Sequence, residues 1–343
     1  MAGETGEGEA RTPLTLASIA DRVGVSVNTV SRALRAPNTV RAELRRQIAK
    51  AMEELNYVPN RLAGGLAGTR SDIVGVVVTS LYYSEFAGIV DTLQSALLSS
   101  NLQVMLANTR YDAEQELRLV RSILSWRPAA VAIIGVDHHP KVDELLRASG
   151  VPIIEMWDLN GTIIDSAVGL DHRAIGASQA AHLIGCGYRQ LAFLGSVREN
   201  DARARKRAEG MKERVIESGL SPVVMATRQE SGHPDLGEAL AFDLLDRHPE
   251  IDGIVCNSDV VAFGVLRALR KRGKRVPDDI GVIGFGDSEA GACMTPSLTT
   301  VRPDRERIGR LTAEMIVSRI NDGPSQRVSV DWQLLEREST RSV

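Results

Sequence analysis

From residue 73 onward the sequence alternates short apolar runs with stretches of helical periodicity, and this alternation constrains the fold most strongly. Apolar runs of strand length occur, for example, at residues 73–78, 131–136 and 280–285. Strands that alternate with helices form parallel sheets covered by helices on both faces. Because the pattern starts afresh after Ser166, we predict that residues 71–343 form an α/β core of two successive, doubly wound parallel-sheet lobes with a cleft between them.

The cleft is the expected place for a ligand, because doubly wound sheets bind ligands at the carboxyl ends of their strands. The segments that should face it are those that follow Val78, Ile134, Leu194, Cys256 and Phe285.

Residues 14–59 have a different pattern, which predicts a small all-α domain. Gly24 should end the first helix, because glycine readily adopts a positive φ, and Ser26 is a good N-cap for the second. Val30 and Leu34, four residues apart, should form the buried face of that second helix. Pro59 closes the unit. The expected helices are 17–23, 27–34 and 42–55.

Basic charge is concentrated in the N-terminal part of the chain. The formal net charge of the whole chain is −3, yet residues 11–70 hold ten Arg and Lys against four Asp and Glu. Such a distribution is expected when only one small module contacts nucleic-acid phosphates.

The remaining bulk features exclude several classes of protein. No apolar run approaches the roughly 20 residues of a membrane helix. Residues 1–13 are rich in Gly and Glu without a basic start or an apolar stretch, so we expect a disordered leader rather than a secretory signal, and a cytoplasmic protein. The three cysteines lack paired spacing, which argues against disulfides and a zinc site. We expect no metal and no cofactor.

The most informative stretch is TLASIADRVGVSVNTVSRALR, residues 15–35. It predicts two short helices joined by a tight Gly-Val-Ser turn, and the second helix opens with small polar residues and ends basic. This is what a recognition helix in the DNA major groove requires. A structural helical hairpin is the alternative for this spacing alone.

These residues resemble the lactose/galactose repressor (LacI/GalR) family of transcriptional regulators. Its T-L-x-x-I-A-x-x-x-G-V-S-x-x-T-V-S-R-x-L and L-x-Y-x-P-N motifs are both present in register. The resemblance continues through VIGFGDSEAGACMTPSLTTVRP, residues 282–303, and LSWRP, VDHHP and IIEMWD make the chain look most like the gluconate-repressor branch.

The resemblance implies which side chains bind DNA. Val27, Asn28 and Arg32 would read bases, and an Arg32 pair with guanine would contribute roughly 1–3 kcal/mol of discrimination. The other implied DNA-binding or supporting positions are Thr15, Leu16, Ser26, Thr29, Ser31, Asn38, Tyr57 and Asn60.

Residues 60–70 resemble the family's hinge helix, in which Leu66 would enter the minor groove. Gly64 and Gly65 depart from the family pattern, and each costs a helix roughly 0.8–1 kcal/mol relative to alanine. We expect this hinge to be disordered without DNA; a plain flexible linker is the alternative.

The resemblance also implies an effector site. Arg207, three residues before Gly210, matches the arginine that clamps the effector, and Arg203 lies one turn earlier. Two guanidinium groups suit a carboxylate or a phosphate, although RARKRAEG could also be a solvated basic face. Gly286 stands where most members of the family carry an acid that grips sugar hydroxyls, which favours an anionic effector. Further candidate effector-binding residues are Ser80, Glu85, Phe86, His138, Glu155, Ser258 and Asp287.

The resulting hypothesis is a transcriptional regulator, by default a repressor, that binds a palindromic operator as a homodimer and responds to a sugar acid such as gluconate or a ketogluconate. A neutral sugar or a sugar phosphate is the alternative effector. A nucleotide-dependent enzyme is disfavoured because Glu289 occupies the third glycine position of GFGDSEAG, and no P-loop or G-x-S-x-G elbow is present. A sugar-binding transport receptor would need an export signal and has no use for residues 15–68.

Overall fold

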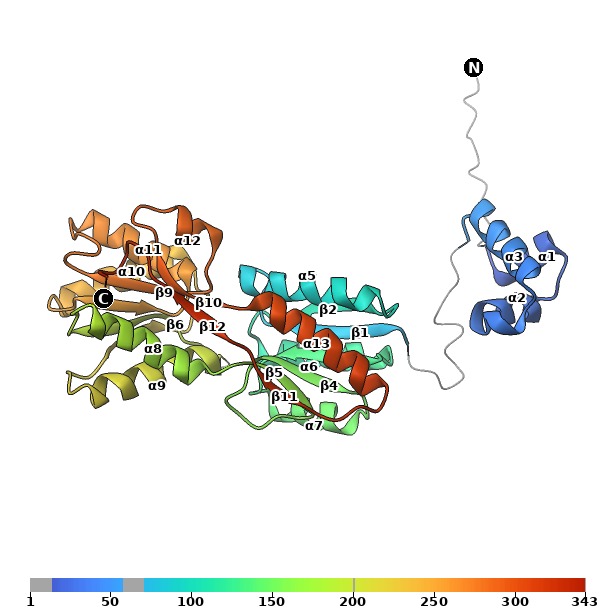
Figure 1. Cartoon of the computed structure of the whole chain (residues 1–343), viewed down its shortest axis with the longest axis horizontal. Helices are drawn as coiled ribbons and strands as arrows, with labels where there is room; N and C mark the ends of the chain where they lie inside the picture. Colours follow the sequence, from blue (N-terminus) through green and yellow to red (C-terminus); the bar gives the residue numbers. More distant parts are fainter. Residues whose placement is uncertain (1–13, 58–70, 200, 343) are drawn as a thin grey trace, which may run out of the picture. The chain divides into compact units, whose positions relative to one another are not determined.

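A computed structural model describes residues 14–57, 71–199 and 201–342 (Figure 1). The chain divides into two compact units, with the division between Arg70 and Ser71. The expected leader, residues 1–13, and the whole of the expected hinge, residues 60–70 with Asn60, Gly64, Gly65 and Leu66, lie outside the described residues, as does Pro59.

The N-terminal unit contains the expected three helices and one additional turn of 3₁₀ helix. Gly24 ends the first helix with a φ of 76°, and the Ser26 side chain accepts a hydrogen bond from the Thr29 N–H (3.2 Å) at the start of the second. Val30 is buried as expected, but Leu34 is 38% exposed; Ala33, three residues after Val30, is buried in its place. The elements are α1 Leu16–Val23, α2 Val27–Arg35, η1 Pro37–Thr39 and α3 Ala42–Glu54.

The first lobe of the core, called the N-lobe here, is built on a six-stranded parallel sheet with the order β11-β5-β4-β3-β1-β2. Helices α5 and α13 cover one face of this sheet, and α6 and α7 cover the other. Its strands are β1 Ile73–Val78, β2 Gln103–Asn108, β3 Ala130–Ile134, β4 Ile153–Asp158, β5 Ser166–Leu170 and β11 Arg327–Ser329. Its helices are α5 Ser84–Leu98, α6 Ala113–Ser125, α7 Pro140–Ala148 and α13 Arg305–Ile320.

The second lobe, the C-lobe, has the sheet order β12-β10-β9-β8-β6-β7, in which only β12 runs antiparallel to its neighbour. Helices α8 and α9 cover one face, and α10 and α11 cover the other. Its strands are β6 Leu191–Ser196, β7 Val224–Arg228, β8 Gly253–Cys256, β9 Gly281–Phe285, β10 Thr299–Pro303 and β12 Trp332–Leu335. Its helices are α8 His172–Gly185, α9 Ala202–Glu217, α10 Pro234–Arg247, α11 Asp259–Lys271 and α12 Glu289–Cys293.

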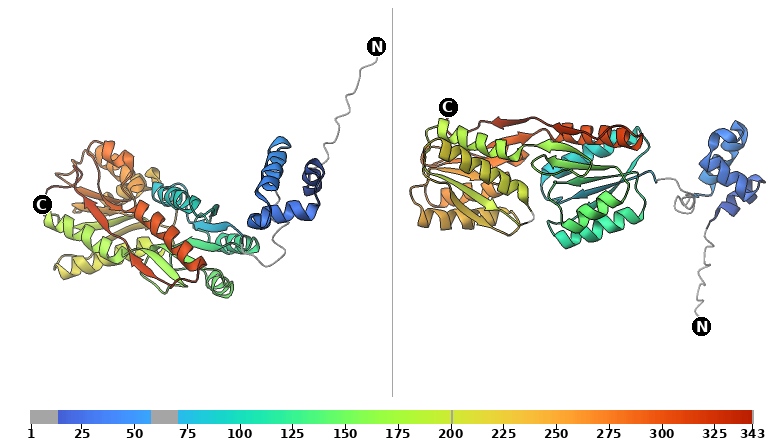
Figure 2. Two further views of the ribbon diagram at one scale, coloured as in Figure 1. Left: turned by 45° about the vertical axis from the view of Figure 1, so that its right-hand side comes forward. Right: turned by 90° about the horizontal axis from the view of Figure 1, so that it is seen from below.

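The two doubly wound lobes are confirmed, but they are not successive along the chain. After β10 the chain returns to the N-lobe, where α13 packs beside α5 and β11 pairs with β5; it then crosses back to place β12 beside β10. Figure 2 shows this C-terminal segment in red, running across both lobes. Three chain crossings therefore join the lobes, rather than one.

None of the helices in the described ranges is long and apolar enough to span a bilayer.

Two glycines allow the backbones of α8 and α9 to touch. A Cβ atom at Gly176 of α8 would lie 1.9 Å from the Arg207 carbonyl oxygen, and one at Gly210 of α9 would lie 2.0 Å from the Arg173 carbonyl oxygen. No side chain fits at such distances, because both obstructing atoms belong to helix backbone.

We therefore expect Gly176→Ala to force the two helices apart and to destabilise the core by about 1–3 kcal/mol. A thermal melt followed by circular dichroism measures the effect as a lower midpoint. Ser178→Ala, on the same helix, adds no Cβ and should melt like the wild type. A Gly176→Ala midpoint equal to that of the wild type would contradict this account.

Candidate functional site

The second helix of the N-terminal unit presents a polar face to solvent. Asn28 and Arg32 are exposed, Val27 is 43% exposed, and Ser31 is partly exposed. Because residues four apart lie on one face of a helix, Asn28 and Arg32 are neighbours on the helix surface, and so are Val27 and Ser31. The hydroxyl groups of Ser26 and Thr29 lie 2.9 Å apart at the start of this helix.

The other proposed DNA-binding residues differ in exposure. Thr15 and Asn38 are exposed, at the start of α1 and within the 3₁₀ turn. Leu16 and Tyr57 are partly buried and pack against the small core formed around Ile19.

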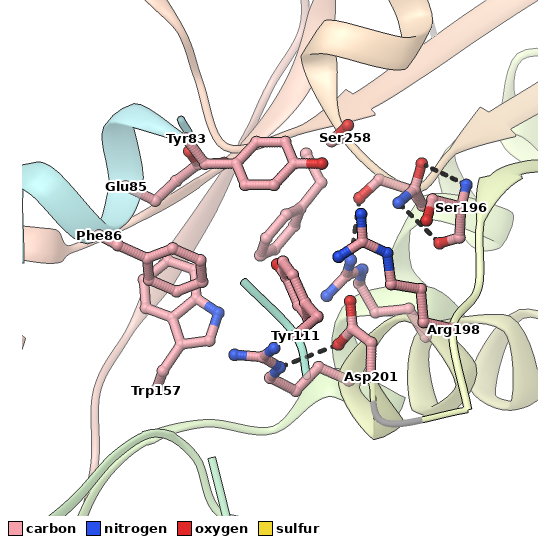
Figure 3. Close-up of a pocket in the computed structure, with 13 residues that line it drawn as sticks. Tyr83, Glu85, Phe86, Tyr111, Trp157, Ser196, Arg198, Asp201 and Ser258 are labelled. Carbon is pink, nitrogen blue, oxygen red and sulfur yellow. Dashed lines mark hydrogen bonds and ion pairs between the residues drawn. The ribbon is translucent and has the colours of Figure 1, made fainter. Parts of the chain in front are cut away.

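The main candidate ligand site is a pocket between the two lobes, at the carboxyl ends of strands from both sheets (Figure 3). Five of the predicted effector residues line it: Glu85, Phe86, Arg203, Arg207 and Ser258. The cavity volume is about 40 Å³, which is room for a few water molecules. A larger ligand therefore requires the lobes or their side chains to move apart.

Both terminal nitrogens of the Arg207 guanidinium group have hydrogen-bond partners within the C-lobe. Its Nη2 donates to the Asn257 carbonyl (2.9 Å), its Nη1 donates to His172 Nδ1 (3.1 Å), and its Cζ lies 4.0 Å from the centre of the Phe285 ring. Because Nδ1 must accept, His172 carries its proton on Nε2, which donates to the Trp157 carbonyl (3.0 Å). Burial and the nearby guanidinium groups lower the pKa of His172 well below its usual value, so it is neutral.

Two buried guanidinium nitrogens have no partner among the described residues: Arg207 Nε and Arg203 Nη1. Arg203 Nε donates to Asp201 (3.0 Å). Burial opposes ionisation of Asp201, but Arg203 and Arg207 outweigh it and hold the pKa of Asp201 below its usual value. Burial lowers the pKa of Arg207 to about 10, which still leaves it charged at neutral pH. Unpaired buried donors of this kind favour an anionic acceptor.

Aromatic rings form the apolar wall of the pocket. Phe86 and Phe285 each meet Trp157 edge to face, with centroids 5.5 and 6.1 Å apart. Trp157 has a φ of 78°, an uncommon conformation for a large residue, and a Cβ atom at Gly169 on the neighbouring strand would lie 2.6 Å from its carbonyl carbon. Tyr111 lies under Arg198, whose Cζ is 4.3 Å from the ring centre.

Four predicted effector residues lie outside this pocket. Ser80 Oγ accepts the Tyr82 N–H (3.0 Å), and Asp287 accepts hydrogen bonds from Arg302 (2.5 Å) and Arg337 (2.6 Å). His138 and Glu155 belong to a separate network, described next.

His138 is held between two carboxylates in the N-lobe. Its Nδ1 lies 2.8 Å from Glu116 Oε1 and its Nε2 lies 3.5 Å from Glu155 Oε1. Burial by itself lowers the pKa of His138, but the two carboxylates outweigh burial and raise that pKa to about 9. His138 lines a second cavity, of about 270 Å³, which shares only Tyr111 and Arg203 with the first. Within the described ranges, no group of three or more His, Cys, Asp or Glu side chains is arranged to hold a metal ion.

Sequence reasoning missed much of the pocket wall. Arg198 and Asn257 lie in segments that were expected to face the cleft, so strand ends were a usable signal for them. Tyr111 follows β2, an edge strand, and had no such signal. The pocket residues that were not singled out are Tyr83, Tyr111, Trp157, Ser196, Arg198, Asp201, Asn257 and Phe285.

Comparisons with known proteins match both units. The sequence profile described as "Bacterial regulatory proteins, lacI family" matches residues 15–60, and "Periplasmic binding protein-like domain" matches residues 180–340. The HTH-type transcriptional regulator GntR of Escherichia coli (strain K12) is 33% identical over 305 residues, which are 89% of this chain and 91% of that protein.

Solved structures agree. A LacI-family transcriptional regulator from Silicibacter pomeroyi has a TM-score of 0.90 at 32% identity, covering 96% of this chain and 100% of that chain. The lac repressor dimer bound to operator and the anti-inducer ONPF has a TM-score of 0.83 at 25% identity, covering 96% and 100%.

A partly buried ion-pair cluster joins the lobes beside the pocket. Lys206 Nζ, from α9 of the C-lobe, lies 2.6 Å from Asp137 Oδ2 and 2.7 Å from Asp158 Oδ2, both of the N-lobe. The Asp158 side chain has no exposed surface. Nearby, the Tyr83 hydroxyl donates to the Gly232 carbonyl (3.2 Å), also from one lobe to the other.

Lys206→Met would leave Asp158 buried without a counter-charge, which costs about 3–5 kcal/mol. We expect this variant to favour separated lobes, with faster amide hydrogen exchange in β4 and the first turns of α9. Lys206→Met combined with Asp158→Asn removes the buried charge and should restore slow exchange. Exchange in Lys206→Met at the wild-type rate would show that the cluster does not hold the lobes together.

Proposed function

The chain belongs to the lacI family of bacterial regulatory proteins, and from this premise we propose that it binds a palindromic operator as a homodimer under the control of a sugar acid bound between its lobes. It is a DNA-binding transcriptional regulator and not an enzyme. As a regulator of genes it acts in the cytoplasm. By default we assign it repression that the effector relieves.

The exposed face of α2 supports the DNA-reading role. Ser26 ends the preceding turn and caps α2, so that Val27, Asn28 and Arg32 project together from a short helix whose opposite side, at Val30, is fully buried. A recognition helix requires this combination of a rigid buried side and free polar side chains.

Exposed apolar side chains support the homodimer. Leu98 and Leu106 are exposed on the N-lobe, and Ile216 and Met225 are exposed on the C-lobe. Leu106 belongs to β2 and Met225 to β7, each of which is one of the two edge strands of its sheet. Large exposed apolar residues at strand edges favour a partner surface, and a two-fold operator matches a two-fold protein.

The two unpaired guanidinium nitrogens, Arg203 Nη1 and Arg207 Nε, are the observation that carries the anionic effector. Each buried unpaired donor costs about 1–3 kcal/mol, which a bound carboxylate would recover. The wall of Phe86, Trp157 and Phe285 suits the carbon chain of such a ligand. Gluconate or a ketogluconate has both parts.

Arg32→Ala tests the DNA-reading role. A bidentate arginine–guanine contact discriminates by about 1–3 kcal/mol, so we expect the variant to lose most of its preference for operator over random duplex in an electrophoretic mobility-shift assay. Arg118→Ala, an exposed arginine of the core, is the control and should bind as the wild type does. Unchanged operator preference in Arg32→Ala would remove this residue from the reading face, and a wild type without any operator preference would overturn the proposed function.

Arg207→Ala tests the effector site. A ligand that binds only the folded protein raises its stability, by about 2.7 kcal/mol at a concentration 100 times Kd. We expect D-gluconate to raise the melting temperature of the wild type and of Arg214→Ala, an exposed arginine on the same helix, but not that of Arg207→Ala. The ligand-induced shift is compared, since Arg207 also supports the fold. Stabilisation by D-glucose alone, or by glucose 6-phosphate alone, would contradict the sugar-acid effector.

A further inference from the structure

Glu85 is a buried acid of the pocket that has no part in the proposed anion contacts. It lies in the first turn of α5, lines the pocket between the lobes and is only 8% exposed. Its carboxyl group makes no ion pair with any residue in the described ranges. Buried acids are normally paired, so one that is unpaired inside a pocket is a candidate for ligand recognition.

The Glu85 carboxyl group reaches from the N-lobe to the end of β9 in the C-lobe. A Cβ atom at Gly286 would lie 2.0 Å from Glu85 Oε1, so the carboxyl group fills the space directly over the Gly286 backbone. Gly286 also has a φ of 123°, which L side chains rarely adopt. The glycine thus leaves the space that the acid from the opposite lobe occupies.

The charges around Glu85 do not fully offset its burial. Burial, with a further contribution from Asp259 of α11, raises the pKa of Glu85 to about 7. A hydrogen bond from its own backbone N–H opposes this rise, as do Arg305 of α13 and Arg207 of α9, but only in part. Near neutral pH the carboxyl group can therefore either accept or donate a hydrogen bond. A ligand hydroxyl group can do the same, which makes it a suitable partner in either state.

We propose that Glu85 is the hydroxyl-recognising residue of this pocket, so that the protein selects a hydroxy acid whose carboxylate pairs with Arg203 and Arg207 and whose hydroxyl group pairs with Glu85. This inference rests on the proposed anionic effector site and adds its selectivity. An acid without hydroxyl groups leaves Glu85 unsatisfied, and a polyol without a carboxylate leaves the two guanidinium nitrogens unsatisfied.

The same arrangement explains how a small molecule could hold the lobes together. Glu85 belongs to the N-lobe, whereas Arg203 and Arg207 belong to the C-lobe. A ligand that carries both groups bonds to both lobes and therefore favours the arrangement of the lobes in which it contacts both. A ligand that bonds to one lobe alone binds equally well whether the lobes are open or closed. Such a ligand does not change the equilibrium between the two arrangements.

Titration calorimetry on the full chain tests this with two probes of equal carbon number, D-gluconate and hexanoate. The variants are Glu85→Ala, Glu85→Gln and, as a control on the same helix, Asp91→Asn, which alters an exposed acid. We expect the wild type and Asp91→Asn to prefer gluconate. We expect Glu85→Ala to lose at least about tenfold in gluconate affinity and less than threefold in hexanoate affinity. Glu85→Gln, which keeps the shape and a hydrogen-bonding group, should lose less than Glu85→Ala.

The outcomes separate this inference from the proposed function. If the wild type binds both acids equally well, or if Glu85→Ala and Glu85→Gln leave the gluconate preference unchanged, the role of Glu85 is wrong while the anion site stands. Equal losses for both acids would likewise assign Glu85 to structure rather than to selection. If neither acid binds the wild type, the sugar-acid site itself fails, and the inference fails with it.

Discussion

Backbone contact between α8 and α9 determines where the charged groups of the pocket lie. Gly176 and Gly210 let each helix touch a carbonyl oxygen of the other, at Arg207 and Arg173. The contact fixes the position of α9 along the axis of α8. It thereby places Arg207 beside His172, the first residue of α8. The hydrogen bonds of Arg207 to His172 and to the Asn257 carbonyl then orient its guanidinium group. Nε is the guanidinium nitrogen that has no hydrogen-bond partner among the described residues.

The pocket is electrostatically asymmetric because its charges are arranged across two lobes. The C-lobe contributes the guanidinium groups and Asp201, whereas the N-lobe contributes Glu85. His172 adds no charge, since burial and the neighbouring arginines keep it neutral. In a buried site of low dielectric constant, unpaired polar groups are costly, which is the physical basis of the proposed pairing of an anion with the arginines and of a hydroxyl group with Glu85.

Communication between this pocket and the rest of the core has a structural basis in the path of the chain. Three crossings join the lobes, and the segment from α13 to β12 belongs to both. Lys206 adds a charged contact between the lobes within one turn of Arg203 and next to Arg207. A change in the separation of the lobes therefore moves the same helix that carries Arg203 and Arg207, the arginines proposed to bind the effector. Interfaces of this kind switch between discrete arrangements, as regulation requires.

Local patterns in the sequence determined the elements and part of the site. Hydrophobic periodicity and the residues Gly24 and Ser26 were sufficient for the helix-turn-helix, and strand-helix alternation was sufficient for two doubly wound sheets. Arg207 was singled out by its match, with Gly210, to the family's Arg-x-x-Gly pattern, and Arg203 by its place one turn earlier on the same helix; both line the pocket. Leu34 was misplaced because a four-residue spacing marks one face of a helix without saying how far the buried stripe extends to either side.

Only the tertiary structure decided which distant residues meet. The return of α13 and β11 to the N-lobe, and the approach of Glu85 to Gly286, join positions more than a hundred residues apart in the sequence. Tertiary packing also decided the burial of His138 between Glu116 and Glu155, although these residues are much closer together in the sequence. Such contacts depend on how whole sheets and helices pack, because the free energy of a long-range contact includes the ordering of all the chain between its two ends.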